Sequence, residues 1–317
     1  AYEIPKRDWS SDVCSSDLPL YHINGQIVTA VAPLVHGGSV VMPHRFSVTT
    51  YWETVVRQQC TWINVVPTII AYLLNAPDPR TRGLDISRIK FCRSASAPLP
   101  PEQHRAFEEK FGISVIETFG MTETNAPCFT NPYEPGQRKI GSPGRPFGNE
   151  GKVIDPATGA EVARGVVGEL MVRGDNVMTC YYKDPANTAK TLEPDGWMHT
   201  GDLGYMDDDG FVFVTGRIKE LIIKGGENIA PREIDEALLL HPAVLEAAAV
   251  GMPDPHYGQD IMACVVLKPG AACSLDELRE FALRELGKYK TPKVIKFVDT
   301  LPKGPSGKVQ RLKLLES

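Results

Sequence analysis

The segment from Thr200 to Ile229 constrains the fold most, because its backbone has to change conformation at two places, a hairpin turn and a glycine pair. The pair Asp209-Gly210 predicts a tight turn between two short strands, since Asp-Gly accepts the positive φ angles that such a turn needs. Asp202 precedes this hairpin, Arg217 follows it, and the segment ends in the flexible pair Gly225-Gly226. This pattern predicts either a polar ligand site at a joint between two domains or a plain surface hairpin.

The residues before this segment alternate between short apolar runs and helical patterns, from Pro19 to about Arg145. Strands that alternate with helices predict an α/β fold with a doubly wound parallel sheet. The run Ile27–Thr29 is ambiguous between a strand and the start of a helix. The expected strands are Ser39–Met42 and Trp62–Val66, and the expected helices are Thr68–Leu74 and Pro101–Phe111.

Two further changes of pattern divide the rest of the chain. From Gly148 to Val172 the apolar period falls to two, which predicts a small β subdomain. After Arg217 strands and helices alternate again, and Ser274 and Glu277 have the spacing of a capping box at a helix start. We therefore expect a partial large domain over 19–216 and a compact, mobile α+β domain over 217–317.

The first residues do not fit either pattern. Residues 7–18 read RDWSSDVCSSDL, in which the triplet SSD occurs twice without a helix or strand period. We expect residues 1–18 to be a non-native or disordered lead, with an irregular exposed loop as the alternative.

Composition excludes several classes of function. The net charge of −5 argues against a nucleic-acid partner, which would require a basic face. The seven cysteines form no CxxC pair, so we expect reduced thiols in the cytoplasm and neither a disulfide framework nor a zinc site. The apolar run Ile27–Met42 is interrupted and falls short of the ~20 residues of a membrane-spanning helix. The sequence leaves the oligomeric state open.

Six short blocks occur in a fixed order after residue 19. They read SASAPL (94–99), ETFGMTET (117–124), GEL (168–170), GWMHTGDLGY (196–205), GRIKELIIKGGENI (216–229) and PKGPSGKVQR (302–311). In this order they resemble the adenylate-forming (AMP-binding) superfamily, of the acyl-CoA synthetase type. The resemblance implies an ATP-dependent ligase that converts a small carboxylic acid into an acyl-adenylate and transfers the acyl group to coenzyme A. ATP/AMP, Mg²⁺ and coenzyme A are the cofactors that it implies.

The resemblance also assigns roles around the nucleotide. Lys308, Thr122 and Glu123 correspond to the catalytic residues, with Glu123 as the Mg²⁺ ligand. A cation such as Lys308 offsets the repulsion between a carboxylate and the α-phosphate. Asp202 and Arg217 correspond to the pair that bonds the ribose hydroxyls, and a structural salt bridge between them is the alternative. The implied nucleotide-binding residues are Ser96, Ala97, Pro98, Phe119, Gly120, Thr122, Asp202 and Arg217.

Three further positions match the family outside the nucleotide site. Lys219 corresponds to the hinge about which the C-terminal domain rotates, although a solvated lysine at a strand end explains it equally well. Gly225, Gly226 and Glu227 correspond to the loop on the coenzyme A side, where glycine lets backbone pass close to a thin ligand. His22 corresponds to a position beside the acyl pocket, with a hydrogen-bonded core histidine as the alternative.

The family also has a Ser/Thr/Gly-rich phosphate-binding loop, for which residues 1–18 offer no match. We therefore expect the chain to be the C-terminal part of a longer enzyme and to be weak or inactive alone, as a nucleotide-binding scaffold. The run FCRSASA (91–97) is typical of ligases for fatty acids, carnitine/crotonobetaine or oxalate, which links the chain to fatty acid metabolism among other routes. Loading of a carrier protein is the alternative to coenzyme A.

Overall fold

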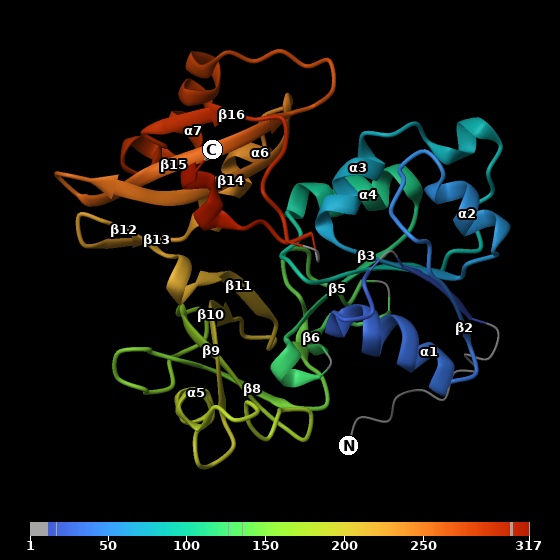
Figure 1. Cartoon of the computed structure of the whole chain (residues 1–317), viewed down its shortest axis with the longest axis horizontal. Helices are drawn as coiled ribbons and strands as arrows, with labels where there is room; N and C mark the ends of the chain where they lie inside the picture. The colour runs from blue at the N-terminus through green and yellow to red at the C-terminus, as the bar shows by residue number, and fades with distance from the viewer. Residues whose placement is uncertain (1–11, 17, 126, 135, 305–306, 317) are drawn as a thin grey trace. The chain divides into compact units, whose positions relative to one another are not determined.

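The computed structural model describes residues 12–16, 18–125, 127–134, 136–304 and 307–316, and its chain divides into two compact units (Figure 1). Unit 1 comprises Ala1–Thr200 and Tyr205–Val214, and unit 2 comprises Gly201–Gly204 and Thr215–Ser317. Residues 1–11 and 17 of the expected lead, and residues 305–306 of the tail, lie outside the described residues.

Unit 1 is built on a sheet with the strand order β2-β1-β3-β4-β5-β6-β7. Neighbouring strands from β2 to β5 are parallel, whereas β5, β6 and β7 pair antiparallel. The expected α/β class is confirmed, and the sheet is mixed where a purely parallel one was expected. The strands are β1 (Val13–Ser16), β2 (Ser39–Val41), β3 (Trp62–Val65), β4 (Phe91–Ser94), β5 (Val115–Gly120), β6 (Pro127–Thr130) and β7 (Arg145–Pro146).

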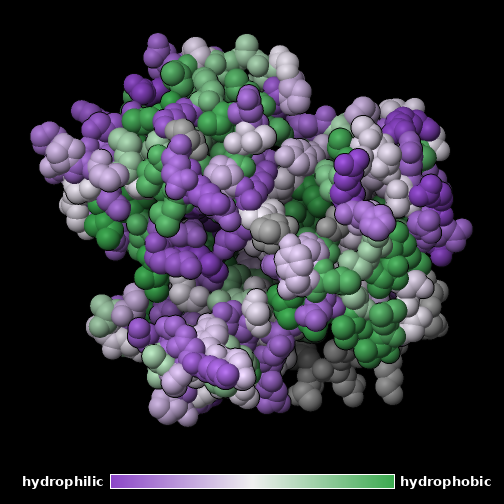
Figure 2. Space-filling view, viewed as in Figure 1, coloured by the Kyte–Doolittle hydropathy of each residue, from purple (hydrophilic) through white to green (hydrophobic). Residues whose placement is uncertain are grey.

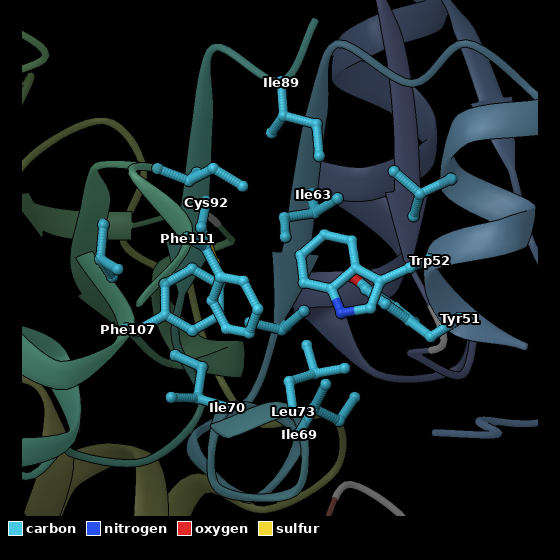
Figure 3. Close-up of a cluster of buried hydrophobic side chains, with 14 of the residues drawn as sticks. Tyr51, Trp52, Ile63, Ile69, Ile70, Leu73, Ile89, Cys92, Phe107 and Phe111 are labelled. Atoms are coloured by element: carbon cyan, nitrogen blue, oxygen red, sulfur yellow. The ribbon is translucent and has the colours of Figure 1, made fainter. Parts of the chain in front are cut away.

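Successive strand residues point to opposite sides of this sheet, and apolar side chains occur on both. Helices therefore cover both faces. Ile63 and Val65 of β3 face a large apolar cluster formed with α2, α3 and α4 (Figure 3). Trp62 lies in a smaller cluster on the other face, which Val28 of η1 joins. The ambiguous run Ile27–Thr29 is therefore helical. The helical segments are η1 (Asn24–Val31), α1 (Ala32–Val35), α2 (Tyr51–Arg57), α3 (Pro67–Leu74), η2 (Pro79–Arg82), α4 (Pro101–Phe111) and η3 (Thr122–Thr124).

Strand β1 differs from the sequence expectation of a disordered lead or an exposed loop. Val13–Ser16 pair with β2 on one side and β3 on the other, and Cys14, Ser15 and Ser16 are at most 1% exposed. Four residues with no recognisable strand period therefore occupy an interior position of the sheet. That the lead is non-native stays a prediction, which resequencing of the gene checks.

The expected β subdomain is a sheet with the order β11-β10-β9-β8. The hairpin between β10 and β11 differs in detail from the predicted tight turn. Five residues, Asp207–Phe211, join the two strands, the Asp207 N–H donates to the Phe211 carbonyl, and only Gly210 among them has a positive φ. The segments are β8 (Glu150–Ile154), β9 (Gly168–Arg173), α5 (Pro185–Thr191), β10 (Met198–Met206) and β11 (Val212–Arg217).

Unit 2 folds around the long hairpin β14–β15, with β12 and β16 paired to β15. Side chains from α6 and α7 form one apolar core with this sheet. The capping box of Ser274 and Glu277 begins α7 as predicted, and Gly287 (φ 70°) interrupts that helix before Lys290. The segments are η4 (Ile218–Glu220), β12 (Ile222–Lys224), β13 (Glu227–Ile229), α6 (Pro231–Leu239), β14 (Val244–Asp254), β15 (Gly258–Leu267), α7 (Leu275–Lys290), β16 (Val294–Phe297) and η5 (Arg311–Glu316).

The visible surface is mixed, with an apolar area over η1 and α1 (Figure 2). The exposed apolar side chains there are Val31, Leu34 and Val35, of which Val35 is 75% exposed. A contiguous apolar area of this kind is typical of a surface that contacts another protein segment. Within the described part of the chain, no helix combines the length and the apolar character needed to cross a bilayer.

Candidate functional site

The predicted catalytic carboxylate lies directly after β5, the last strand of the parallel set in unit 1. Phe119 and Gly120 end this strand, and the short helix η3 that follows presents Thr122 and Glu123. Phe119 packs against Phe129 of β6, with ring centroids 5.6 Å apart. The carboxyl ends of parallel strands are the usual place for ligand sites in open α/β sheets. The local fold thus brings the residues of the ETFGMTET block to a ligand-competent edge.

Glu123 is held by a loop that sequence reasoning did not single out. The Tyr181 hydroxyl donates a hydrogen bond of 2.8 Å to Glu123 Oε1, and the Met178 N–H donates to the Glu123 carbonyl at 2.7 Å. The pKa of Tyr181 is raised by burial and by the neighbouring Glu123 carboxylate, which keeps the hydroxyl protonated as a donor. No sequence pattern links two residues so far apart, so only the fold reveals this contact.

The small-residue block SASAPL follows β4, and a hydrogen bond connects it to the His22 segment. Asn24 Nδ2 donates to Ser96 Oγ at 3.1 Å, and the Asn24 N–H donates to His22 Nδ1 at 3.2 Å. Burial lowers the pKa of His22, so its ring is neutral at pH 7, with Nδ1 as acceptor and the proton on Nε2. Ser96 has a positive φ of 73°, an uncommon conformation for serine that turns the chain after the strand.

The predicted ribose-binding pair meets in unit 2. Arg217 Nε donates to Asp202 Oδ1 at 2.7 Å, and Arg217 Nη2 donates to Asp202 Oδ2 at 3.3 Å. Asp202 is only 3% exposed and lies within β10. Burial raises the pKa of Asp202 more strongly than Arg217 lowers it. The structure therefore contains the salt bridge of the alternative reading, and the ribose role stays a prediction.

Lys308 lies in the same unit as this ion pair. The Lys308 charge is close enough to lower the pKa of Asp202, and partial desolvation followed by the Arg217 charge lowers the pKa of Lys308. Lys308 lies between the two partners of the bridge Lys303↔Val309, so it is on a short loop closed at its base. By surface area Lys308 is still exposed, so its ammonium is accessible although protein atoms crowd around it. Unit 2 thus assembles a carboxylate, a guanidinium and an accessible ammonium group.

The predicted hinge and the coenzyme A loop lie on either side of β12. Lys219 is exposed in the short helix η4, a few residues after the unit boundary at Thr215. Gly225 (φ 55°) and Gly226 (φ 88°) form the two-residue loop between β12 and β13, for which positive φ at both residues is typical. Glu227 is exposed at the start of β13.

The predicted site residues fall into two groups, one in each unit. Unit 1 brings together the His22 segment with Ser96, and holds Glu123 by Tyr181. Unit 2 brings together Asp202, Arg217 and Lys308. Their combination into one site stays a prediction. The unit 1 residues of the prediction are His22, Ser96, Ala97, Pro98, Phe119, Gly120, Thr122 and Glu123.

One group with metal-ligand chemistry was not expected from the sequence. Single ligand atoms of His241, Cys273 and Glu277 lie within 4.8 Å of one another. The Ala243 N–H donates to His241 Nδ1 at 3.3 Å, which places the proton of the neutral ring on Nε2, the nitrogen that faces Cys273. A metal at Nε2 would require the opposite tautomer. The residues therefore do not fit a metal site.

Models of two protein families match the sequence. The model described as "AMP-binding enzyme" matches residues 1–182, and the model described as "AMP-binding enzyme C-terminal domain" matches residues 233–308. The first match covers more than half of the chain.

Curated relatives and solved structures extend this similarity. The chain is 62% identical to sulfoacetate–CoA ligase of Cupriavidus necator over 96% of its length, and 38% identical to oxalate–CoA ligase of Saccharomyces cerevisiae over 95%. It spans 59% and 54% of these relatives, respectively. The crystal structure of ATP-bound MatB from Rhodopseudomonas palustris is similar with a TM-score of 0.88 and 35% identity, covering 97% of this chain and 60% of that one.

Proposed function

This chain belongs to the AMP-binding enzyme family, and on that premise we propose that the full-length gene product is an AMP-forming acid–CoA ligase for a short acid with a second anionic group, such as sulfoacetate. The observation that carries this proposal is the 62% identity with a sulfoacetate–CoA ligase over 96% of the chain. Because the chain spans 59% of that relative, the activity is proposed for the longer protein. For these 317 residues alone, a nucleotide-binding scaffold remains the second candidate.

The reaction has two steps. In the first, a carboxylate oxygen of the acid attacks the α-phosphorus of ATP, and the bond to the leaving pyrophosphate breaks. Lys308 supplies the cation that offsets the repulsion of the two anions, and Thr122 donates a hydrogen bond to the α-phosphate. Asp202 and Arg217 hold the ribose, since a carboxylate and a guanidinium together offer acceptors and donors to a diol.

In the second step the thiol sulfur of coenzyme A attacks the acyl carbonyl, the bond to AMP breaks, and the thiol proton is released. Rotation about Lys219 withdraws Lys308 and presents the loop of Gly225, Gly226 and Glu227 to the thiol. An exposed residue in a short helix after the unit boundary supports this hinge, since a hinge needs only to absorb a change in φ and ψ.

Glu123 is the residue proposed to hold Mg²⁺. Tyr181 occupies Oε1, and among the described residues none donates to Oε2, which leaves one carboxylate oxygen for a cation. Magnesium in such sites uses few protein carboxylates and shares its other positions with phosphates and waters. Bound Mg²⁺ would neutralise charge on the phosphate oxygens.

Tyr181→Phe tests the positioning of Glu123. Loss of one hydrogen bond to a carboxylate costs about 1.5–3 kcal/mol, so we expect the Mg²⁺ concentration for half-maximal adenylation to rise by about tenfold or more. The measurement is a Mg²⁺ titration of ATP–pyrophosphate exchange with the full-length protein. Tyr182→Phe is the matched control, because Tyr182 is 85% exposed. Equal Mg²⁺ dependence in both variants would contradict the role of Tyr181.

A panel of acids tests the function itself. The full-length protein is assayed for AMP release and for acyl-CoA with sulfoacetate, malonate, oxalate, crotonobetaine, acetate and medium-chain fatty acids. We expect the highest kcat/KM with a short acid that has a second anionic group. Preference for a fatty acid would instead support the link to fatty acid metabolism. Adenylate without acyl-CoA, together with transfer to a pantetheinylated carrier protein, would replace the coenzyme A assignment with carrier loading.

A further inference from the structure

Arg93 is a buried cation in the sheet of unit 1. It lies in β4, opposite Asn64 of β3, and is only 7% exposed. Its side chain is on the sheet face that η1 covers, since it bonds Asn24 at the start of that helix. Transfer of an ion from water into a protein interior costs several kcal/mol unless it is compensated. A buried guanidinium is therefore expected to have an anionic partner, a functional role, or both.

The described neighbours of Arg93 are neutral. Its Nη1 donates to Asn24 Oδ1 and, at 3.0 Å, to Asn64 Oδ1, while Nη2 donates to Thr118 Oγ1 at 2.5 Å. The nearby Cys14 thiol is neutral too, because burial raises its pKa. Burial lowers the pKa of Arg93 to about 10, which still leaves the guanidinium charged at pH 7. Within residues 12–16, 18–125, 127–134 and 136–304, no carboxylate forms an ion pair with it.

The same neighbours fix the orientation of the guanidinium. Asn64 Nδ2 donates to Asn24 Oδ1 at 3.1 Å and to Thr29 Oγ1 at 2.7 Å, so the amides that receive the Arg93 hydrogen bonds are themselves held. An arginine has five N–H groups. The three hydrogen bonds leave Nε and one hydrogen of Nη2 without a partner among the described residues. When Thr118 accepts the Nη2 hydrogen that points away from Nε, the other Nη2 hydrogen and Nε–H have the parallel spacing that binds two oxygens of one oxyanion.

This network also touches both predicted pocket segments. Asn24, which accepts from Arg93, donates through Nδ2 to Ser96 and through its N–H to His22. Ser96 is a predicted nucleotide residue and His22 a predicted acyl-pocket residue. Asn24 thus links Arg93 to both of them. Thr118, which accepts from Arg93, lies two positions before Gly120, another predicted nucleotide residue.

We propose that Arg93 binds the second anionic group of the acid substrate, a sulfonate or a carboxylate, through its Nε and Nη2 hydrogens. The inference rests on the proposed function, in which the reacting carboxylate of the same acid approaches ATP. A dianionic acid is repelled by the triphosphate, and a fixed cation offsets that repulsion and sets which end of the acid points away from the nucleotide. The neutral amides around Arg93 do not compete with the ligand for its charge.

Matched acids that differ in one charge test this proposal. The full-length protein and its Arg93→Met variant are assayed with sulfoacetate and its neutral isostere methylsulfonylacetate, and with malonate and monomethyl malonate. A charged hydrogen bond contributes about 1.5–3 kcal/mol, so we expect Arg93→Met to lower the sulfoacetate to methylsulfonylacetate ratio of kcat/KM by about 10–10². The effect is expected mainly in KM. A fall in the malonate ratio alone would identify a carboxylate as the ligand.

A purely structural role of Arg93 gives a different result. The rates for charged and neutral acids would then fall together, and an unchanged ratio overturns the proposal. If Arg93→Met does not fold, the wild-type protein still decides the question through inhibition by methanesulfonate, with dimethyl sulfone as the neutral control. Inhibition competitive with sulfoacetate by the anion alone supports the proposal, and equal or absent inhibition overturns it. A wild-type protein that adenylates only monoanionic acids would overturn the proposed function and this inference together.

Discussion

Lys308→Ala in the full-length protein is expected to lower the rate of acyl-adenylate formation by about 10²–10³, the usual effect of removing one preorganised group that stabilises charge in the transition state. Lys308 is accessible, and it lies near Asp202 and Arg217 in unit 2. Its ammonium offsets the repulsion between the acid and the α-phosphate only in the first step. The rate of thioester formation from preformed acyl-adenylate should therefore change little.

The measurement separates the two steps. ATP–pyrophosphate exchange reports adenylation, and acyl-CoA formation from added acyl-adenylate reports thioester formation. Lys288→Ala is the matched control, because Lys288 is exposed on α7 of the same unit. Exchange within about threefold of wild type in Lys308→Ala would contradict the assignment. Equal loss in both steps would show that the variant damages unit 2 in general.

Asp235→Ala is expected to destabilise unit 2 by up to about 3–5 kcal/mol, because it removes the closer and more buried of the two carboxylates that pair with Arg311. Asp235 lies on α6 and accepts from the Ala249 N–H at 2.6 Å and from Arg311 Nη2 at 2.5 Å. Burial raises the pKa of Asp235, and Arg311 partly opposes this shift. The carboxylate therefore ties α6 and β14 to η5, the segment that follows Lys308.

Glu233→Ala is the matched control on the same helix. Glu233 forms an ion pair with Lys290 at 2.6 Å, and the two side chains are 46% and 39% exposed. Exposed pairs contribute about 0–1 kcal/mol, so this variant should be near wild type. Urea unfolding, with hydrogen exchange of the unit 2 amides to localise the change, measures both variants. A similar loss of stability in both would show that the Asp235–Arg311 pair is not a major source of stability.

The sequence by itself determined the features that depend on local pattern and on short motifs. The alternation of strands and helices predicted the α/β class, and Ser274 with Glu277 predicted the start of α7. The six ordered blocks predicted the same family that the matching family models show. Each of these signals lies within a few neighbouring residues, where backbone preference and side-chain spacing are sufficient.

Only the tertiary structure decided which distant side chains meet. The interior position of β1, the hold of Tyr181 on Glu123, and the neutral surroundings of Arg93 have no signature in local periodicity. Arg93 bonds residues 69, 29 and 25 positions away in the chain. Local patterns indicate which side of a segment faces the apolar core. The identity of a buried polar partner depends instead on which distant segments the fold brings together. For this reason the sequence was sufficient to identify the family, whereas the fold supplied the residue proposed to select the acid.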